Sequence, residues 1–241
     1  MTPSVSSILQ SLQATPLVWL AVTLVAYRAA FTIHRKSSLN PIANPVLISV
    51  TIVVSVLLIS HTPYQSYFEG AAFVHFLVGP ATVALAIPLY AHLERLKTML
   101  VPLTVALLVG SLTSIGSAVA LGWLFGASPD TLLSLASKST TMPIAMGITE
   151  KLGGLPSLTA LTVTLTGISG AIMARGLLNL VRTDDMAVRG FAVGLTAHAI
   201  GTGYALQVSD VAGAFSALGM GLNGVATTLL LPLLVQLASG R

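Results

Sequence analysis

Charged side chains are scarce in this sequence: aspartate, glutamate, lysine and arginine together make up only 7% of its 241 residues. Ordinary soluble domains carry roughly 25%, so this chain has too few charges to cover a water-exposed surface. Its mean hydropathy is +0.91, and its apolar residues form continuous runs, unlike the alternating strands of a membrane β-barrel. The scarcity of charge therefore predicts an all-α polytopic integral membrane protein.

Cysteine is absent, which excludes disulfides and thiolate metal sites. The sequence also lacks a glycine-rich phosphate loop ending in Lys-Ser/Thr, a His-Glu-x-x-His motif and the spacing of a hydrolytic triad. We therefore expect no enzyme activity, no cofactor and no metal. The net charge of +4 comes from basic residues that lie mostly at the ends of apolar runs. That pattern orients membrane proteins, and we expect no nucleic-acid partner.

Six stretches are apolar enough to cross a bilayer, which takes about 20 residues. A polar loop at His61–Glu69 separates the second from the third, and prolines interrupt the third. We expect one transmembrane domain over residues 1–241, in which residues 1–16 form an N-terminal tail without the basic region of a cleaved signal peptide. The six stretches are Leu17–Ile33, Pro41–Ser60, Gly70–Leu93, Met99–Phe125, Leu155–Val181 and Val211–Ser239.

Two further segments, residues 131–154 and 190–209, are too polar or too glycine-rich for plain lipid-facing helices. Basic residues gather at 34–36, 95–97 and 175–189, and all three groups lie in the cytoplasm only if residues 131–154 enter and leave on the same side. The sequence therefore predicts six full spans plus two broken or re-entrant segments that enter from opposite sides and meet at their tips. Eight full spans is the alternative.

A weak internal similarity links two short runs about 60 positions apart. Ala81–Ala86 resembles Thr140–Ala145, and each run precedes a charged stretch and a long apolar run. Transporters are often built from inverted repeats whose broken helices line the binding site. The similarity predicts such a repeat, although apolar segments also resemble one another by chance.

The first polar cluster, Lys138, Ser139, Thr140 and Thr141, offers one ammonium and three hydroxyls within four residues. Pro143 removes a backbone donor and disfavours helical geometry in the residue before it. A helix that starts there presents backbone N–H groups, which attract anions. The cluster predicts a site for a small carboxylate. The alternative is that Lys138 extends to a lipid headgroup and the hydroxyls only cap a helix.

The second cluster places His198 beside Gly201, Thr202 and Gly203. Glycine lets a ligand or another helix approach the backbone closely, and histidine changes charge near neutral pH. We expect these residues to close the carboxylate site from the opposite side, with His198 a candidate for proton coupling. A histidine bonded between helices and glycines used for packing are the alternatives.

Two more polar residues are candidates. Asn223 is isolated in a charge-free span and either lines the cavity or bonds neighbouring helices. Glu150, next to Lys151, is either a proton-coupling site or half of a solvated ion pair.

Four runs in order resemble signatures of the LrgB/CidB family, and the resemblance extends from about Asn40 to Pro232. The chain departs from the family at Ser137, where a proline is expected, and at Gly203-Tyr204, where the family has alanine and arginine. The missing arginine leaves the identity of the anion open. The four runs are Gly79–Tyr90, Ser137–Ala145, Arg189–Thr202 and Gly213–Ser216.

The resemblance implies two functions. Bacterial members are described as holin- or antiholin-like proteins that modulate murein hydrolases and autolysis, and they are paired with a small LrgA/CidA-type membrane protein. The related plastid protein exchanges glycolate and glycerate, and bacterial relatives are linked to pyruvate uptake. The polar, broken segments favour the second function, a secondary transporter of small monocarboxylates or 2-hydroxy acids in the bacterial inner membrane. We expect its partners to be a small carboxylate, the LrgA/CidA-type protein, membrane lipid and further copies of the chain.

Overall fold

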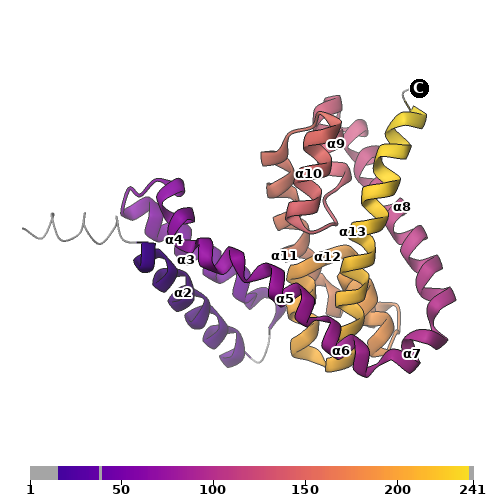
Figure 1. Cartoon of the computed structure of the whole chain (residues 1–241), viewed down its shortest axis with the longest axis horizontal. Coiled ribbons are helices and arrows are strands. Elements are labelled where there is room, and N and C mark those ends of the chain that lie inside the picture. Colours follow the sequence, from indigo (N-terminus) through magenta and orange to yellow (C-terminus); the bar gives the residue numbers. More distant parts are fainter. Residues whose placement is uncertain (1–15, 38–39, 239–241) are drawn as a thin grey trace, which may run out of the picture. The chain divides into compact units, whose positions relative to one another are not determined.

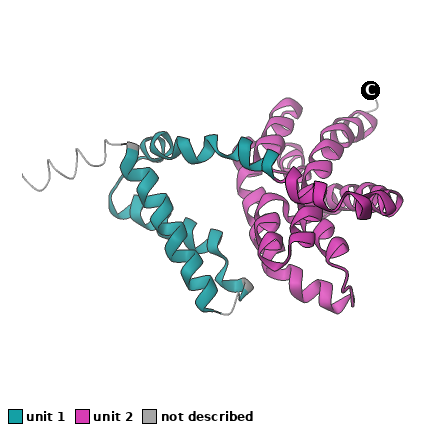
Figure 2. Cartoon of the chain, turned by 60° about the horizontal axis from the view of Figure 1, so that its bottom comes forward, with its two compact units in different colours: residues 1–84 teal, residues 85–241 magenta. Residues whose placement is uncertain are grey.

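The computed structural model describes residues 16–37 and 40–238, and every regular element in these ranges is a helix. This confirms the all-α prediction. The predicted N-terminal tail falls outside the described residues except for Pro16, where the first described helix starts. The chain divides into two compact units, residues 1–84 and 85–241 (Figure 2), which are described separately below.

Unit 1 is built around its long first helix, which packs against the two following α-helices. Trp19 meets the ring of Tyr67 edge-on at 6.1 Å, and the hydroxyl groups of Thr23 and Tyr67 lie 3.1 Å apart. These contacts fix the first helix of the unit against the helix that carries Tyr67. The elements of unit 1 are α2 (Pro16–Lys36), η1 (Pro41–Ala43), α3 (Pro45–Ile59), α4 (Tyr64–Phe76) and α5 (Val78–Ala84).

Prolines explain most of the short interruptions between residues 76 and 100. A proline lacks the N–H that would bond to the carbonyl four positions earlier, and its ring clashes with that carbonyl. The interruptions at Leu77, Leu85 and Met99 each lie three positions before a proline, namely Pro80, Pro88 and Pro102. The chain is therefore divided here into α5, α6 (Ala86–Ala91), α7 (Leu93–Thr98) and the start of α8.

Unit 2 also contains three long helices, one pair of short helices and one broken helix (Figure 1). The long ones carry exposed large apolar side chains along their outer faces, for example Val109, Leu165 and Leu229, as a lipid-facing surface requires. The elements are α8 (Leu100–Leu124), α9 (Pro129–Ala136), α10 (Met142–Leu152), α11 (Pro156–Leu180), α12 (Met186–Val208) and α13 (Asp210–Ala238).

Five helical stretches are long and apolar enough to cross a membrane, namely Leu17–Lys36, Tyr64–Ala91, Leu100–Leu124, Pro156–Leu180 and Asp210–Ala238. The remaining predicted span, Pro41–Ser60, is shorter than expected: α3 has 15 residues, or about 22 Å at 1.5 Å per residue, against a core about 30 Å thick. The predicted loop at His61–Glu69 was wrong from Tyr64 onward, because α4 begins at that residue.

The first predicted re-entrant segment is a pair of short helices, α9 and α10, joined by a non-helical tip at Ser137–Thr141. With 8 and 11 residues, neither helix is long enough to cross a bilayer. Buried hydroxyls tie this α9–α10 hairpin together and to α11. The hydroxyl of Thr149 lies 3.0 Å from that of Ser137 and 3.0 Å from that of Thr159 of α11, and Thr159 donates to the Ser134 carbonyl at 3.1 Å.

The second predicted segment, α12, is broken at His198, which has φ 41° and ψ −131°. Its two halves fold back on each other. Arg189 and Tyr204 line the same small pocket, although 15 residues of straight helix would place them about 22 Å apart. A Cβ placed on Gly201 would lie 2.8 Å from Val193 Cγ1. The α12 hairpin and the α9–α10 hairpin confirm the prediction of two broken segments.

Close backbone contacts hold the α12 hairpin against α13. A Cβ on Gly190 would collide with the Ala212 carbonyl, and one on Gly194 would collide with the Ser216 carbonyl. Such small-residue contacts replace the hydrophobic driving force that is missing between helices in lipid. They place the break in α12 beside the middle of α13.

The two runs that resemble each other in sequence differ in backbone geometry. Leu85, in the first run, keeps helical angles (φ −64°, ψ −14°), whereas Thr141, in the second, is extended (φ −65°, ψ 144°). The first run bends a helix, whereas the second run starts one, α10, so an internal repeat stays a prediction.

Candidate functional site

The tips of the two hairpins meet at one side chain. Asn223 of α13 is 1% exposed, and its amide donates to the carbonyl of Ser139 at 2.9 Å and to that of Leu195 at 3.0 Å. Ser139 belongs to the tip of the α9–α10 hairpin, and Leu195 lies three residues before the break in α12. Ser111 of α8 donates to the Asn223 side-chain oxygen at 2.7 Å, so that Asn223 uses both its donors and its acceptor.

The break in α12 explains why Leu195 needs this partner. In a continuous helix the Leu195 carbonyl would accept from the N–H of Ala199, four positions later. The non-helical His198 interrupts that pattern, and a buried carbonyl without a donor is costly. The side chain of Asn223 supplies the donor instead.

His198 is held firmly in its unusual conformation. A carbonyl can only accept, so Nε2 carries the proton that it donates to Val163 O at 2.9 Å. The ring lies against Gly167, where a Cβ would be 2.6 Å from its Cε1 atom, and Thr202 donates to the His198 carbonyl at 2.8 Å. The ring is therefore part of the contact between α11 and α12.

The tip of the α9–α10 hairpin is shaped by its sequence. Thr140 donates to the Ser137 carbonyl at 3.1 Å, Thr141 is extended, and Pro143 is the second residue of α10. The extended residue and the proline start a new helix in a new direction. Lys138 is thereby placed at the end of a helix pair, with neighbours from other helices around it.

Lys138 points its ammonium into a hydroxyl-lined cleft. Nζ donates to Ser114 Oγ at 3.4 Å and to Ser139 Oγ at 3.3 Å, and these two hydroxyls share a bond of 2.7 Å. Within residues 16–37 and 40–238 the ion pairs are Arg95–Asp185 and Lys97–Glu94, so Lys138 has no carboxylate partner there.

The cleft around Lys138 has a volume of about 560 Å³ and lies between α8, α11, the first half of α12 and the α9–α10 tip. We call it the Lys138 cleft. Its polar wall consists of one ammonium and seven hydroxyls, and no aspartate or glutamate lines it. The hydroxyls belong to Thr113, Ser114, Ser117, Ser139, Thr166, Ser169 and Thr196.

The predicted site residues divide into two groups. Lys138 and Ser139 line the cleft, and Asn223 holds the backbone of Ser139. The remaining predicted residues are not among those that line it. Thr140, His198, Gly201 and Thr202 are buried, Thr141 is half-buried, and Pro143, Gly203 and Glu150 are exposed.

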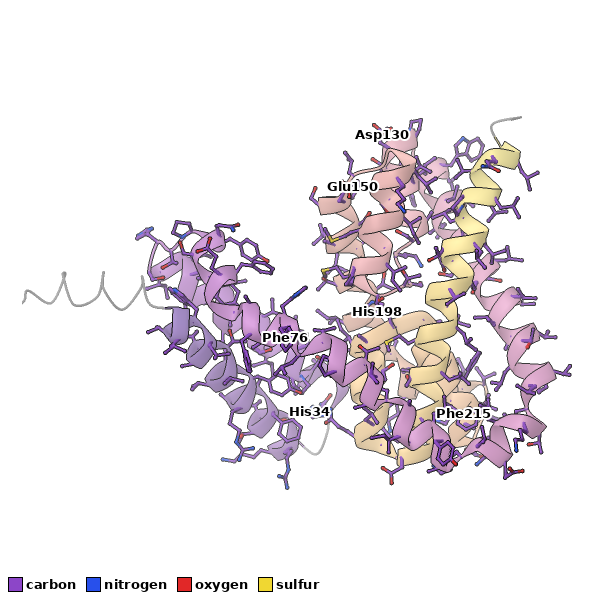
Figure 3. The ribbon with its side chains drawn as sticks, viewed as in Figure 1. His34, Phe76, Asp130, Glu150, His198 and Phe215 are labelled. Atoms are coloured by element: carbon purple, nitrogen blue, oxygen red, sulfur yellow. The ribbon has the colours of Figure 1, made fainter. Side chains whose placement is uncertain are left out.

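Glu150, the second candidate for proton coupling, lies with Asp130 at the open end of the α9–α10 hairpin, away from His198 (Figure 3). Within residues 16–37 and 40–238, no three histidine, aspartate or glutamate side chains gather closely enough to hold a metal ion.

Sequence reasoning missed the hydroxyls of α8, α11 and α12. Their signal was helical spacing: Gly110, Ser114 and Ser117 recur at intervals of four and three along a charge-free span, which places them on one helix face. Thr166, Ser169 and Gly170 of α11 lie at positions i, i+3 and i+4, which also share one helix face. Small polar residues on one face of an apolar helix indicate either a helix contact or a cavity wall, and here they line the cleft.

Comparison with known proteins gives a consistent result. The sequence profile described as the LrgB-like family matches residues 23–237. The chain is 34% identical to the uncharacterized protein YxaC of Bacillus subtilis, with 92% of this chain and 96% of that protein aligned. It is 31% identical to the holin-like protein CidB of Staphylococcus epidermidis, over 94% and 97% of the two chains. No solved structure matches.

Proposed function

This chain belongs to the LrgB-like family, and we propose that it is a secondary transporter of small monocarboxylates and 2-hydroxy acids of the glycolate, glycerate and pyruvate type. The observation that carries the proposal is Lys138, whose ammonium lies in a cleft lined by hydroxyls and has no carboxylate partner among the described residues. We propose the bacterial cytoplasmic membrane as its location.

The charge of the cleft favours a monoanion. An ionisable group at membrane depth is costly and is normally paired or functional. Lys138 contributes one positive charge, and the other polar lining groups are neutral hydroxyls that both donate and accept. A carboxylate would neutralise the ammonium, and a hydroxyl or keto oxygen on the neighbouring carbon would bond to Ser114 or Ser139.

The surrounding architecture favours transport over a fixed binding site. Two broken segments that meet tip to tip are typical of secondary transporters, in which discontinuous helices form the substrate site. Non-helical backbone at membrane depth is tolerated where protein or a water-filled cavity satisfies it. We propose that the α12 hairpin and the α9–α10 hairpin form the two sides of such a site, with His198 as the candidate for proton coupling.

Uptake into proteoliposomes tests the proposal. Purified protein is reconstituted, and entry of labelled glycolate, glycerate or pyruvate is followed with and without a proton gradient. We expect Lys138→Ala to reduce uptake at least tenfold, whereas Lys151→Ala, which removes an exposed lysine of α10, should leave it unchanged. Folded wild-type protein that carries none of the three acids under any gradient would exclude the transporter.

A holin-like role is the second candidate, and the name of the CidB relatives favours it. In this role the chain would be a membrane component that modulates murein hydrolases and autolysis together with a small LrgA/CidA-type protein. Such a component requires packing faces and self-association but no solute site. It predicts lysis phenotypes on expression that Lys138→Ala leaves intact, whereas the transporter predicts that this substitution abolishes any phenotype.

A further inference from the structure

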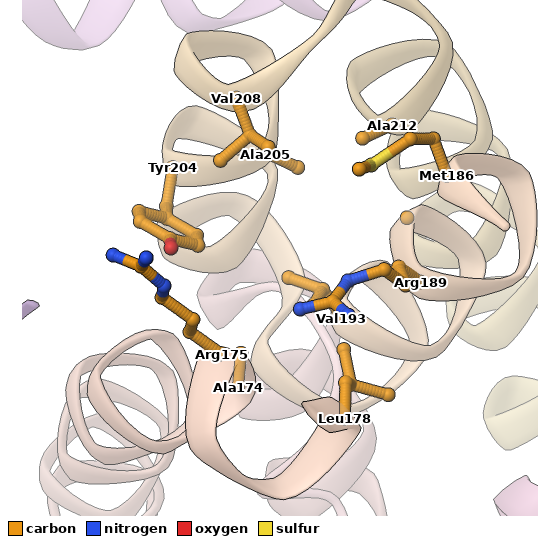
Figure 4. Close-up of a pocket in the computed structure, with 11 residues that line it drawn as sticks. Ala174, Arg175, Leu178, Met186, Arg189, Val193, Tyr204, Ala205, Val208 and Ala212 are labelled. Carbon is orange, nitrogen blue, oxygen red and sulfur yellow. The ribbon is translucent and has the colours of Figure 1, made fainter. Parts of the chain in front are cut away.

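A second basic group lies beside the Lys138 cleft. Arg175 of α11 and Arg189 of α12 line one pocket together with Tyr204, and no aspartate or glutamate is among the residues that line it. In Figure 4 the Arg175 side chain extends beside the ring of Tyr204, and Arg189 reaches into the same space from the other side. We call this site the Arg175 pocket.

The two arginines differ in how firmly their side chains are held. Arg189 donates to the Thr183 carbonyl at 2.7 Å and to the Asn179 side chain at 2.9 Å, so its guanidinium is fixed to the end of α11 and to the turn that follows it. Arg175 is exposed, and its guanidinium is in neither of the described ion pairs. One positive charge is therefore fixed, and the other can swing toward a solute.

The Arg175 pocket and the Lys138 cleft share a wall. Ala174, Leu178 and Val193 line both. The Arg175 pocket has a volume of only about 30 Å³, against about 560 Å³ for the Lys138 cleft, so the substrate has room in the cleft and not in the pocket. Its arginines therefore act on the cleft through their electric field and by contact at its edge.

We propose that the Arg175 pocket is the anion-recruiting mouth of the Lys138 cleft, where small carboxylates gather before they reach Lys138. This inference rests on the proposed function. Positive charge beside a low-dielectric cleft concentrates anions and repels cations at its entrance. The residues of the shared wall are apolar and cannot bind a carboxylate. An anion is therefore not held between the two arginines and Lys138.

The absence of cysteine from the sequence gives a direct test that does not depend on transport. Ser169 lines the cleft and lies six positions before Arg175 on α11, about 9 Å along the helix. A Ser169→Cys chain is reconstituted in liposomes and labelled with two methanethiosulfonate reagents, one with an anionic sulfonate and one with a cationic trimethylammonium group. The ratio of the two rates measures the local potential.

We expect Arg175→Gln to lower the anionic-to-cationic ratio in the Ser169→Cys chain about fivefold, since loss of one charge slows one reagent and speeds the other. The effect should shrink at high salt. Arg182→Gln removes an exposed arginine outside both pockets and should leave the ratio unchanged. Ser157→Cys, at the far end of α11, is the matched control position, and Arg175→Gln should not alter its ratio.

An unchanged ratio in the Ser169→Cys chain would overturn the proposal and leave Arg175 as a lipid anchor. Failure of both reagents to reach that cysteine would overturn it as well, because the mouth would be closed to water-soluble ions. If Arg175→Gln changes the ratio of labelling rates but the wild-type protein takes up none of the acids, the proposed mouth would be supported and the transporter excluded. Uptake with an unresponsive ratio would support the transporter while excluding the mouth.

Discussion

The side-chain amide of Asn223 donates to the carbonyl of Ser139 at 2.9 Å and thereby holds the tip of the α9–α10 hairpin against α13. The same amide binds the Leu195 carbonyl at 3.0 Å, so one residue fixes both helix breaks. We expect Asn223→Leu to destabilise the protein by about 1–3 kcal/mol, because it leaves both carbonyls and Ser111 without their partner. Thermal unfolding in detergent would measure the effect.

The control for Asn223 lies on the same helix. Thr228 is exposed and bonds only to the Gly224 carbonyl of its own helix, so Thr228→Val should change the unfolding temperature little. Hydrogen exchange should also accelerate around residues 138–142 and 195–200 in Asn223→Leu alone. Equal unfolding temperatures for the two variants would show that Asn223 does not connect the hairpins.

His198 allows backbone strain to be separated from side-chain contacts. A positive φ costs a non-glycine residue about 1–3 kcal/mol. His198→Ala keeps that cost and loses the bond to Val163, whereas His198→Gly loses the bond but relieves the strain. We therefore expect His198→Gly to be more stable than His198→Ala by about 1–2 kcal/mol. The opposite order in detergent unfolding would show that α12 does not keep this conformation.

The contact between α12 and α13 predicts opposite effects for two glycine substitutions. Gly194→Ala should destabilise the protein by about 1–3 kcal/mol, because its Cβ would collide with the Ser216 carbonyl. At Gly221 of α13 a Cβ meets nothing within 4 Å, so Gly221→Ala should be neutral or stabilising by up to about 1 kcal/mol. Two equally mild variants would argue against close packing of these helices.

The sequence predicted the hairpins because their composition conflicts with a lipid-facing helix. Lys138, Pro143 and the glycines after His198 each mark a departure from an apolar span, and charge placement indicated that residues 131–154 return to the side they entered. The tip-to-tip meeting of the two segments was also predicted, and Asn223 provides it.

The composition of the cleft wall was harder to predict, because it depends on how helices pack. Ser114 and Thr166 are ordinary residues of apolar spans, and only the packing of α8, α11 and α12 brings them to Lys138. Conversely, His198 stands out in the sequence but bonds to the Val163 backbone. The type of a residue indicates possible chemistry, whereas the direction of its side chain depends on tertiary contacts.

Asp185 predicts a pH dependence. It caps α12 by accepting from the N–H groups of Ala187 and Val188 and forms a two-oxygen pair with Arg95 at 2.7 Å. Burial alone would raise the pKa of Asp185, but the two N–H bonds and the Arg95 guanidinium outweigh it and hold the pKa below its usual value.

Because the pKa of Asp185 is lower in the folded state, the stabilisation is fully present above the unfolded value of about 3.9. It is lost as the pH falls through the lower folded value. We therefore expect Asp185→Asn to be less stable than wild type at pH 7 and the difference to disappear on acidification below about pH 4. Asp184→Asn, which alters the exposed neighbour, should show no such convergence in unfolding scans.

Ser114 should set how firmly the cleft holds a substrate. Its hydroxyl accepts from Lys138 and donates to Ser139, so Ser114→Ala removes a neighbour of the ammonium without altering the charge. We expect uptake to persist with an apparent KM raised about fivefold to tenfold, which corresponds to about 1–1.4 kcal/mol of lost binding. Ser117 lines the same cleft, but its hydroxyl bonds to the Ser114 carbonyl of its own helix, and Ser117→Ala should raise KM less than twofold. Uptake measured over a range of substrate concentrations would give the KM of each variant. Identical KM values for Ser114→Ala and Ser117→Ala would mean that the Lys138–Ser114–Ser139 cluster does not contact the substrate.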